Sequence, residues 1–379
     1  MTTSTKTHSD FFYRALRYAN CPPPYSLPSP LLHIAGMDQA QGDAVTERSP
    51  NLWVIILAGG DGRRLGSLTA DASGVCTPKQ FCSLNGGPSL LQMSLDRALR
   101  HAPRERIVVV VTAAHRRWWE PALWPLRRSG VIVQPSNRGT GLGVLLPLLV
   151  IAKSDPTACV LCLPSDHYVA NEDVLSQSIR QASALHAADF DKVTLLGMSP
   201  TAPDPGFGYL APATDSRAGI RPVQSFIEKP DSDLAAQIIR DGGVWNSGIF
   251  AGLIQVILDL YPRHVPGLLR NLKSVVDDAW FDPQAPWAPL ESLYASCPAV
   301  DFSRDVLERQ PARLQFLTVP PCGWSDVGTP ARLATTLQAL PSQCVRGASF
   351  TSSGSAFNLE TAFTAAPTAD GRGFAPEAL

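Results

Sequence analysis

The chain has 379 residues with 32 basic and 33 acidic side chains, so its net charge is close to zero. This balance argues against nucleic acid or a membrane surface as a partner, because both attract strongly basic proteins. No apolar run approaches the roughly 18 residues that a membrane span needs, and no apolar signal segment opens the sequence. We therefore expect a cytoplasmic protein with no nucleic-acid partner and no membrane partner.

Two segments at the ends of the chain lack the apolar periodicity of a folded domain. Residues 1–50 contain a Cys-Pro-Pro-Pro-Tyr cluster and few periodic apolar positions, and residues 341–379 are rich in Ser, Thr, Ala and Gly. Such compositions are typical of disorder, since they bury too little apolar surface to fold. We expect a folded domain over residues 51–340 between two disordered extensions.

The domain opens with a buried strand and a glycine-rich turn. Trp53–Leu57 is an apolar run too short for a helix, and Ala58-Gly59-Gly60-Asp61-Gly62 follows it directly. Glycines at this position let the backbone turn sharply and bring its N–H groups close to an anion. Arg64 and Lys79 add positive charge, and the planar guanidinium group suits phosphate.

The following elements alternate between helix and strand. The pattern predicts helices over residues 90–101, capped by Ser89, over residues 115–126, and up to Ile151. It predicts strands over residues 106–111, 131–133 and 158–163. This alternation is typical of a doubly wound parallel sheet with right-handed crossovers.

The second half of the domain alternates less regularly. We expect helices over residues 173–186 and 231–240, the second capped by Asp231. We expect strands over residues 193–198, 223–229 and 248–251.

The cysteine content does not indicate a disulfide framework. Of the eight cysteines, Cys159 and Cys162 form a Cys-x-x-Cys pattern inside a predicted strand. Residues three apart on a strand point to opposite faces, so these two cannot share a metal ion or a disulfide. We expect both to be buried and reduced.

The glycine-rich stretch does not fit two common phosphate-binding motifs. Leu65 stands where a dinucleotide fingerprint needs glycine, and Arg63-Arg64 follow Gly62 where an NTPase loop needs lysine. The stretch instead resembles the signature of nucleoside-diphosphate-sugar pyrophosphorylases, Leu-Ala-Gly-Gly-x-Gly-x-Arg-Leu followed by Pro-Lys. Its Pro78–Phe81 form resembles the mannose-1-phosphate guanylyltransferase branch, and the resemblance spans about residues 53–338.

The resemblance implies an α/β, GT-A-like (Rossmann-like) nucleotidyltransferase fold, with a mixed, mostly parallel sheet flanked by helices. It implies a nucleotidyltransferase that uses a nucleoside triphosphate, expected to be GTP, and a hexose 1-phosphate, expected to be mannose 1-phosphate, with Mg²⁺. Residues 51–170 would form a nucleotide-binding half and residues 171–340 a sugar-phosphate half. A glucose-1-phosphate transferase using UTP or dTTP and a non-catalytic NDP-sugar-binding relative remain alternatives. The oligomeric state stays open, a homo-oligomer included.

Two aspartates are candidates for metal ligands. Asp166 follows a central strand at its carboxyl end, where open α/β sheets bind ligands. Mg²⁺ typically takes one or two protein carboxylates and fills its octahedron with phosphate oxygens and water. Asp326 lies in a Trp-Ser-Asp-Val-Gly stretch, and the resemblance implies both aspartates as metal ligands.

Adjacent Glu228 and Lys229 would point to opposite faces of a regular strand. A break in the strand before Pro230 would turn both into one cleft. By resemblance, Glu228 accepts hydrogen bonds from sugar hydroxyls and Lys229 binds the sugar phosphate.

The resemblance also implies roles for the remaining site residues. The implied nucleotide-binding residues are Ala58, Gly59, Gly60, Gly62, Arg64, Lys79, Gln134, Asn137, Arg138, Gly139, Thr140 and Asp166. The implied sugar-phosphate-binding residues are Gly208, Glu228, Lys229 and Asn246, and the implied catalytic residues are Arg64, Lys79 and Lys229.

The sequence departs from the usual guanylyltransferase pattern near the expected base site. Gly139 replaces the asparagine that usually follows arginine, Gly141-Leu142 replace Ala-Pro, and Arg63 replaces threonine. These departures bear on the choice of base rather than on the type of reaction.

Overall fold

The computed structural model describes residues 51–70, 74–123, 126, 130–184, 191–213, 219–261, 267–278 and 281–340. The two expected disordered extensions, residues 1–50 and 341–379, lie outside the described residues. None of the helices in the described ranges is long and apolar enough to cross a membrane.

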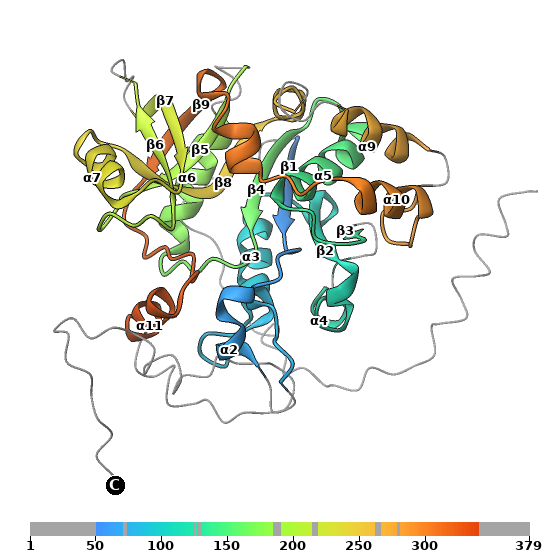
Figure 1. Cartoon of the computed structure of the whole chain (residues 1–379), viewed down its shortest axis with the longest axis horizontal. Helices are drawn as coiled ribbons and strands as arrows, with labels where there is room; N and C mark the ends of the chain where they lie inside the picture. Colours follow the sequence, from blue (N-terminus) through green and yellow to red (C-terminus); the bar gives the residue numbers. More distant parts are fainter. Residues whose placement is uncertain are drawn as a thin grey trace, which may run out of the picture. The chain divides into compact units, whose positions relative to one another are not determined.

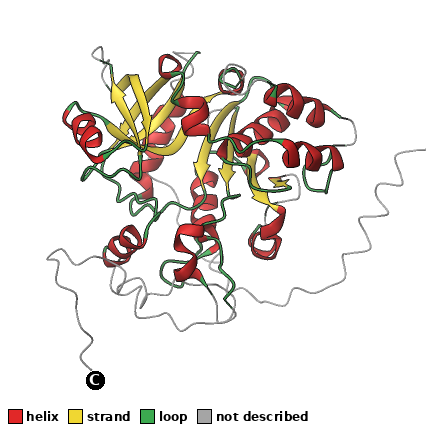
Figure 2. Ribbon diagram, viewed as in Figure 1, coloured by secondary structure: helices red, strands yellow, loops and turns green. Residues whose placement is uncertain are grey.

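Within the described residues, nine strands form one sheet in the order β3-β2-β1-β4-β8-β5-β9-β7-β6. The strands are the yellow arrows in Figure 2. The strands are β1 (Leu52–Leu57), β2 (Ile107–Thr112), β3 (Val131–Gln134), β4 (Cys159–Pro164), β5 (Val193–Met198), β6 (Gly208–Pro212), β7 (Ile220–Glu228), β8 (Val244–Leu253) and β9 (Leu314–Val319). The α/β fold class is confirmed.

The two halves of the sheet differ in strand direction. Strands β3, β2, β1 and β4 pair in parallel, as expected for a doubly wound unit. In the second half only β5 and β9 pair in parallel, whereas β4–β8, β5–β8, β6–β7, β6–β8 and β7–β9 pair antiparallel. The parallel majority expected from the resemblance therefore holds for the first half only. The short connection between β6 and β7 accounts for the antiparallel pairing of those two strands.

Helices cover both faces of the sheet (Figure 1). The described helices are α2 (Gly66–Thr69), α3 (Leu90–Leu99), α4 (Arg116–Ala122), α5 (Thr140–Ser154), α6 (Glu172–Ala184), α7 (Ser232–Arg240), α8 (Ile254–Leu258), α9 (Leu268–Asp277), α10 (Ala288–Ser296) and α11 (Pro330–Gln338). A π-helical turn, η8 (Phe302–Leu307), follows α10. One core cluster contains residues of α5, α8, α9, α10 and η8, and the other contains residues of α3, α4, α6 and α7.

Strand alternation assigns side chains to these two cores. Ile55 of β1 belongs to the first cluster, while its neighbours Val54 and Ile56 belong to the second. In the same way, Cys162 lies in the first cluster and Cys159 in the second, and both are buried free cysteines. The prediction that they face opposite sides of their strand is confirmed.

Two predicted helix caps are present. The Ser89 side chain accepts a hydrogen bond from the Gln92 N–H, and the Gln92 side chain accepts one from the Ser89 N–H, which completes a capping box. The Asp231 side chain accepts a hydrogen bond from the Leu234 N–H at the start of α7.

A third apolar cluster joins the beginning of the domain to its end. Leu65 and Leu68, after the glycine-rich turn, are buried together with Val327, which precedes α11, and with Leu333 and Leu337 of α11. This packing brings the Trp-Ser-Asp-Val-Gly stretch next to the glycine-rich turn, although most of the domain lies between them in sequence.

Candidate active site

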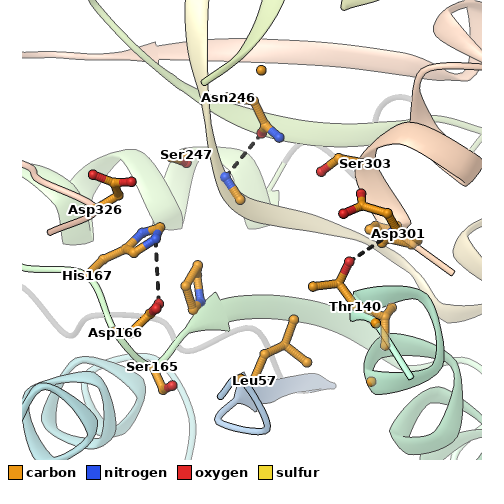
Figure 3. Close-up of a pocket in the computed structure, with 18 of the residues that line it drawn as sticks. Leu57, Thr140, Ser165, Asp166, His167, Asn246, Ser247, Asp301, Ser303 and Asp326 are labelled. Atoms are coloured by element: carbon orange, nitrogen blue, oxygen red, sulfur yellow. Dashed lines mark hydrogen bonds and ion pairs between the residues drawn. The ribbon is translucent and has the colours of Figure 1, made fainter. Parts of the chain in front are cut away.

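A pocket of about 440 Å³ opens at the carboxyl ends of β1, β3 and β4, where Leu57, Gln134 and Pro164 are the last strand residues. Figure 3 shows Asp166, His167 and Asp326 on one side of it and Thr140, Asp301 and Ser303 on the other. The expected site residues that line it are Gly59, Gly60, Arg64, Gln134, Asn137, Gly139, Thr140, Asp166, Gly208, Glu228, Lys229, Asn246 and Asp326. Ala58, Gly62, Lys79 and Arg138 do not line it.

The glycine-rich turn packs directly against the segment that carries Lys79. Gly62 has a φ of +63°, and a β-carbon there would lie 2.7 Å from the Lys79 backbone nitrogen. Because both the backbone conformation and the available space exclude a side chain, only glycine fits here. The turn and the Pro78–Phe81 segment therefore form one compact unit.

The ammonium group of Lys79 holds the two candidate metal-ligand segments together. Its Nζ lies 2.9 Å from the Asp166 Oδ2 and donates to the Asp326 backbone carbonyl at 2.6 Å. Burial by itself raises the pKa of the Asp166 carboxyl, but Lys79 and His167 outweigh it, so the pKa lies below its usual value. Asp166 is therefore ionised at neutral pH and already paired with a protein cation.

A histidine and a tryptophan lie beside this pair. The Trp324 indole N–H donates to the His167 Nδ1 at 3.3 Å, and the His167 Nε2 lies 3.7 Å from the Asp166 Oδ1. Burial, the largest cause, lowers the pKa of His167 to about 4, so the ring is neutral at pH 7. Since Nδ1 accepts, the single ring proton is on Nε2 and faces Asp166.

Asp326 also has a cationic partner. Its Oδ2 accepts from Arg332 at 2.9 Å, and its Oδ1 accepts from the Gly328 N–H at 3.1 Å. Arg332 lies on α11, and its guanidinium stacks over the Phe207 ring at 4.2 Å. Arg332 thereby links Asp326 to the loop that carries Gly206, Phe207 and Gly208 into the pocket.

The strand break expected before Pro230 is present. Strand β7 ends at Glu228, and Lys229 adopts a left-handed φ of 54° while its N–H donates to the Phe207 carbonyl. As a result, Glu228 and Lys229 both line the pocket, with Lys229 Nζ 3.2 Å from Glu228 Oε1. The prediction that a break turns both side chains into one cleft is confirmed.

Backbone strain is concentrated at this site. Among the described residues, the only non-glycine residues with positive φ are Lys229 and Val327, and Val327 directly follows Asp326. A left-handed β-branched residue is costly, and such strain persists where surrounding contacts fix the backbone, often at functional sites.

Glu228 lies among other carboxylates. Burial is the main cause that raises its pKa, and neighbouring Lys229 opposes the shift. Asp301 and Glu308 raise the pKa further, and the Glu308 Oε1 accepts a hydrogen bond from the Glu228 N–H.

The expected nucleotide loop packs tightly against the segment before η8. The Val300 N–H donates to the Arg138 carbonyl, and the Gly141 N–H donates to the Val300 carbonyl at 2.8 Å. The Phe302 N–H donates to the Thr140 Oγ1, also at 2.8 Å. We call residues 300–302, which make these contacts, the strap. The strap joins the loop to the segment that carries Asp301 and Ser303.

The strap explains the two glycines that depart from the usual pattern. A β-carbon on Gly139, which has a φ of +85°, would collide with the Val300 carbonyl oxygen. A β-carbon on Gly141 would lie 2.9 Å from the same oxygen. Any larger residue at either position would push the Val300 segment away from the loop.

Two other nucleotide-loop residues have protein partners. Gln134 is buried, and its Oε1 accepts a hydrogen bond from the Tyr294 hydroxyl. The Arg138 guanidinium donates to the Ala295 carbonyl at 3.3 Å. Arg138 is therefore directed toward α10 rather than into the pocket, because the Val300 strap lies beside it.

Some residues at this site were not predicted from the sequence. Gln80 lines the pocket but was not among the expected site residues. Its place in the Pro78–Phe81 segment, directly after Lys79, could have indicated it. Arg332 gave no sequence signal, because only the fold brings α11 to Asp326. Asn246 was expected as a site residue ahead of a strand over residues 248–251, but it lies inside the longer strand β8, where its Oδ1 accepts from the Gly248 N–H.

The carboxylates present suit a hard divalent cation. Within the described ranges, no three His, Cys, Asp or Glu side chains gather as a ready ligand set. Asp166 and Asp326 nevertheless both line the pocket and both lie close enough to His167 to affect its pKa. Two carboxylates that line one pocket suit a hard divalent cation that takes its remaining ligands from water and other oxygen donors.

The fold defines a GT-A-like α/β protein with a pocket at the carboxyl edge of its sheet. The chain belongs to the nucleotidyl transferase family, which matches residues 53–343.

Curated relatives and a solved structure agree with this assignment. The mannose-1-phosphate guanylyltransferase of Escherichia coli K12 is 29% identical over 289 residues, covering 73% of this chain and 58% of the relative. The xanthan biosynthesis protein XanB of Xanthomonas campestris is 30% identical over 283 residues, covering 73% and 57%. A crystal structure from Thermus thermophilus, described as a mannose-1-phosphate geranyltransferase, superposes with a TM-score of 0.65 at 28% identity, covering 77% of this chain and 80% of that one. The chain thus spans little more than half the length of the two curated relatives.

Proposed function

We propose that this protein transfers a guanylyl group from GTP to mannose 1-phosphate, giving GDP-mannose and pyrophosphate. One observation carries the proposal: the glycine-rich turn, two ionisable aspartates and the Glu228–Lys229 pair all open onto a single pocket. At one end, that pocket offers cationic groups and backbone N–H donors for phosphates. At the other end, the Glu228 carboxylate and the Asn246 amide are available to bind sugar hydroxyls. The names of the relatives support the choice of hexose and base.

The chemistry requires positioning more than proton transfer. An oxygen of the sugar phosphate attacks the α-phosphorus of GTP, the new O–P bond forms, and the bond to the bridging oxygen breaks to release pyrophosphate. The attacking oxygen is already ionised at neutral pH, so no general base is needed. The protein has to align the two phosphates and neutralise their charges.

The residues divide between the two substrates. Gly59, Gly60 and Arg64 line the pocket on the side of residues 51–170 and bind the triphosphate. On the side of residues 171–340, Lys229 positions the sugar phosphate. Glu228, Asn246 and the backbone of Gly208 bind the sugar hydroxyls.

Mg²⁺ held by Asp166 and Asp326 would neutralise charge on the triphosphate when bound. Lys79 supports this end of the pocket from behind, because its ammonium contacts Asp166 and the Asp326 carbonyl.

The decisive experiment measures pyrophosphate release over a matrix of four nucleoside triphosphates and several hexose 1-phosphates. We expect GTP to be preferred over ATP by at least about tenfold in kcat/KM, consistent with one or two hydrogen bonds to the guanine edge. Equal or better use of UTP or dTTP with glucose 1-phosphate would instead identify the protein as a glucose-1-phosphate nucleotidyltransferase. Binding of GDP-mannose without any turnover would identify a non-catalytic relative.

A further inference from the structure

A buried glutamine, which also lines the pocket, holds two carbonyls of the glycine-rich turn. The side-chain Nε2 of Gln80 donates to the Ala58 carbonyl at 3.0 Å and to the Gly60 carbonyl at 2.8 Å. Gln80 is only 2% exposed, so water does not compete for these two hydrogen bonds. Both donor hydrogens of one amide group are therefore used on two carbonyls of the same turn.

The carbonyl between these two is also held. The hydroxyl of Thr112, at the end of β2, donates to the Gly59 carbonyl at 3.0 Å. Three successive carbonyl oxygens, those of Ala58, Gly59 and Gly60, thus accept side-chain hydrogen bonds from Gln80 and Thr112. Neither donor residue belongs to the turn itself, so the turn is fixed by its surroundings rather than by its own sequence.

Because of peptide geometry, the fixed carbonyls also fix backbone N–H groups of the turn. In a trans peptide, the C=O of one residue and the N–H of the next point in opposite directions. Fixing the Ala58 and Gly59 carbonyls therefore fixes the direction of the Gly59 and Gly60 N–H groups, each opposite to the carbonyl of its own peptide. Within the described residues, neither of these N–H groups donates to a protein acceptor, and both glycines line the pocket.

We infer that Gln80 is a positioning residue for the triphosphate: its amide fixes the peptide planes of the turn so that their N–H groups face the phosphates. This inference rests on the proposed function, since it takes a nucleoside triphosphate as the ligand of the turn. Thr112 acts in the same way on the central peptide. Preorganised donors bind an anion better because they do not have to reorient when it arrives.

The test replaces the donors without changing the shape of the side chains. Gln80→Met keeps the length of the side chain and removes both N–H donors, and Thr112→Val does the same for the hydroxyl. The matched control is Gln315→Met, because Gln315 is a buried glutamine whose Nε2 donates to the Thr194 hydroxyl on β5, outside the pocket. For each variant we would measure the Kd of GTP with Mg²⁺, the KM of mannose 1-phosphate, kcat and the melting temperature.

We expect Gln80→Met to weaken GTP binding by at least about tenfold, as the loss of two fixed hydrogen bonds predicts. Thr112→Val should weaken it by about three- to tenfold, since one bond is lost. The KM of mannose 1-phosphate should stay within about twofold of the wild-type value. Gln315→Met should lower the melting temperature without changing GTP affinity.

Two results would overturn the inference. One is wild-type GTP affinity in both Gln80→Met and Thr112→Val. The other is equal weakening of GTP and mannose 1-phosphate, which would show that these side chains only support packing. If Gln80→Met does not fold, Thr112→Val still decides between these outcomes. A wild-type protein that binds no nucleoside triphosphate would instead defeat the proposed function, so the two failures are distinguishable.

Discussion

The ammonium nitrogen of Lys79 lies 2.9 Å from a carboxylate oxygen of Asp166, and Lys79 itself is only 7% exposed. Lys79 does not line the pocket, so in this arrangement it acts on a ligand through Asp166 and through the Asp326 carbonyl. The pair also explains why Asp166 stays ionised although burial opposes its charge. The first two predictions follow from this contact.

Asp166→Asn should lower turnover by on the order of 10²-fold or more, because it removes a charge that would hold the metal beside the triphosphate. The amide keeps the shape of the carboxyl and one acceptor for Lys79, so the fold should survive. Steady-state kinetics in saturating Mg²⁺ and a thermal melt would check both parts. Turnover near the wild-type level would contradict the role of Asp166 as a ligand.

Lys79→Ala and Lys229→Ala should weaken different substrates. Lys79→Ala should mainly raise the KM of GTP and should also lower the melting temperature, since Asp166 loses its cation. Lys229→Ala should mainly raise the KM of mannose 1-phosphate with little effect on stability, because the Lys229 side chain is 52% exposed.

Titrating each substrate against each variant tests this division of roles. Lys273→Ala is the control, since Lys273 forms an exposed pair with Asp277 on α9, away from the pocket. The same pattern of lost affinity in both site variants would show that the division is wrong.

Gly141→Ala should destabilise the protein by about 1–3 kcal/mol, because the added methyl group overpacks the contact with Val300. Gly139→Ala should destabilise the protein at least as much. Its methyl group would collide with the Val300 carbonyl, and alanine would also be strained at the positive φ of this position. Urea unfolding measures both. Gly66→Ala serves as the control: its nearest neighbour would be Cys76 Sγ at 3.5 Å, and its stability should change by less than about 1 kcal/mol. Wild-type stability in both Gly139→Ala and Gly141→Ala would show that the Val300 segment shifts away from the added methyl group at no cost in stability.

His101 should make the protein less stable in mild acid. Burial, followed by the charges of Arg180, Arg100 and Arg97, lowers its pKa to about 4, compared with about 6.5 in the unfolded chain. As the pH falls from about 6.5 to about 4, the unfolded state binds a proton that the folded state does not, so stability decreases over this window. The decrease should amount to about 2–3 kcal/mol for this residue.

The comparison of wild type with His101→Leu isolates this effect. Free energies of unfolding in urea at pH values of about 7.5 and about 4.5 would give the pH dependence of each protein. The variant should lose part of that dependence and keep the part due to His167, whose pKa is also lowered to about 4. An unchanged pH dependence would mean that folding does not lower the pKa of His101.

Local features were predictable from the sequence because their physical causes are local. The Ser89 and Asp231 caps each depend on a hydrogen bond that spans three residues. The opposite orientation of Cys159 and Cys162 follows from the two-residue period of a strand. The end of β7 near Pro230 was predictable, because proline lacks the N–H that a sheet needs. The left-handed φ of Lys229 was not, because a residue before proline favours extended backbone.

The sequence by itself also determined the family, the fold class and some of the pocket residues, Gly59 and Gly60 of the glycine-rich turn and Glu228 of β7 among them. What only the tertiary structure decided is how distant segments meet. The antiparallel pairing of β4 with β8, the contact between Val300 and Gly141, and the support of the turn by Gln80 all join residues whose partners cannot be read from local periodicity. The physical reason is that these contacts are fixed by the packing of the three apolar clusters, and each cluster collects side chains from distant parts of the domain.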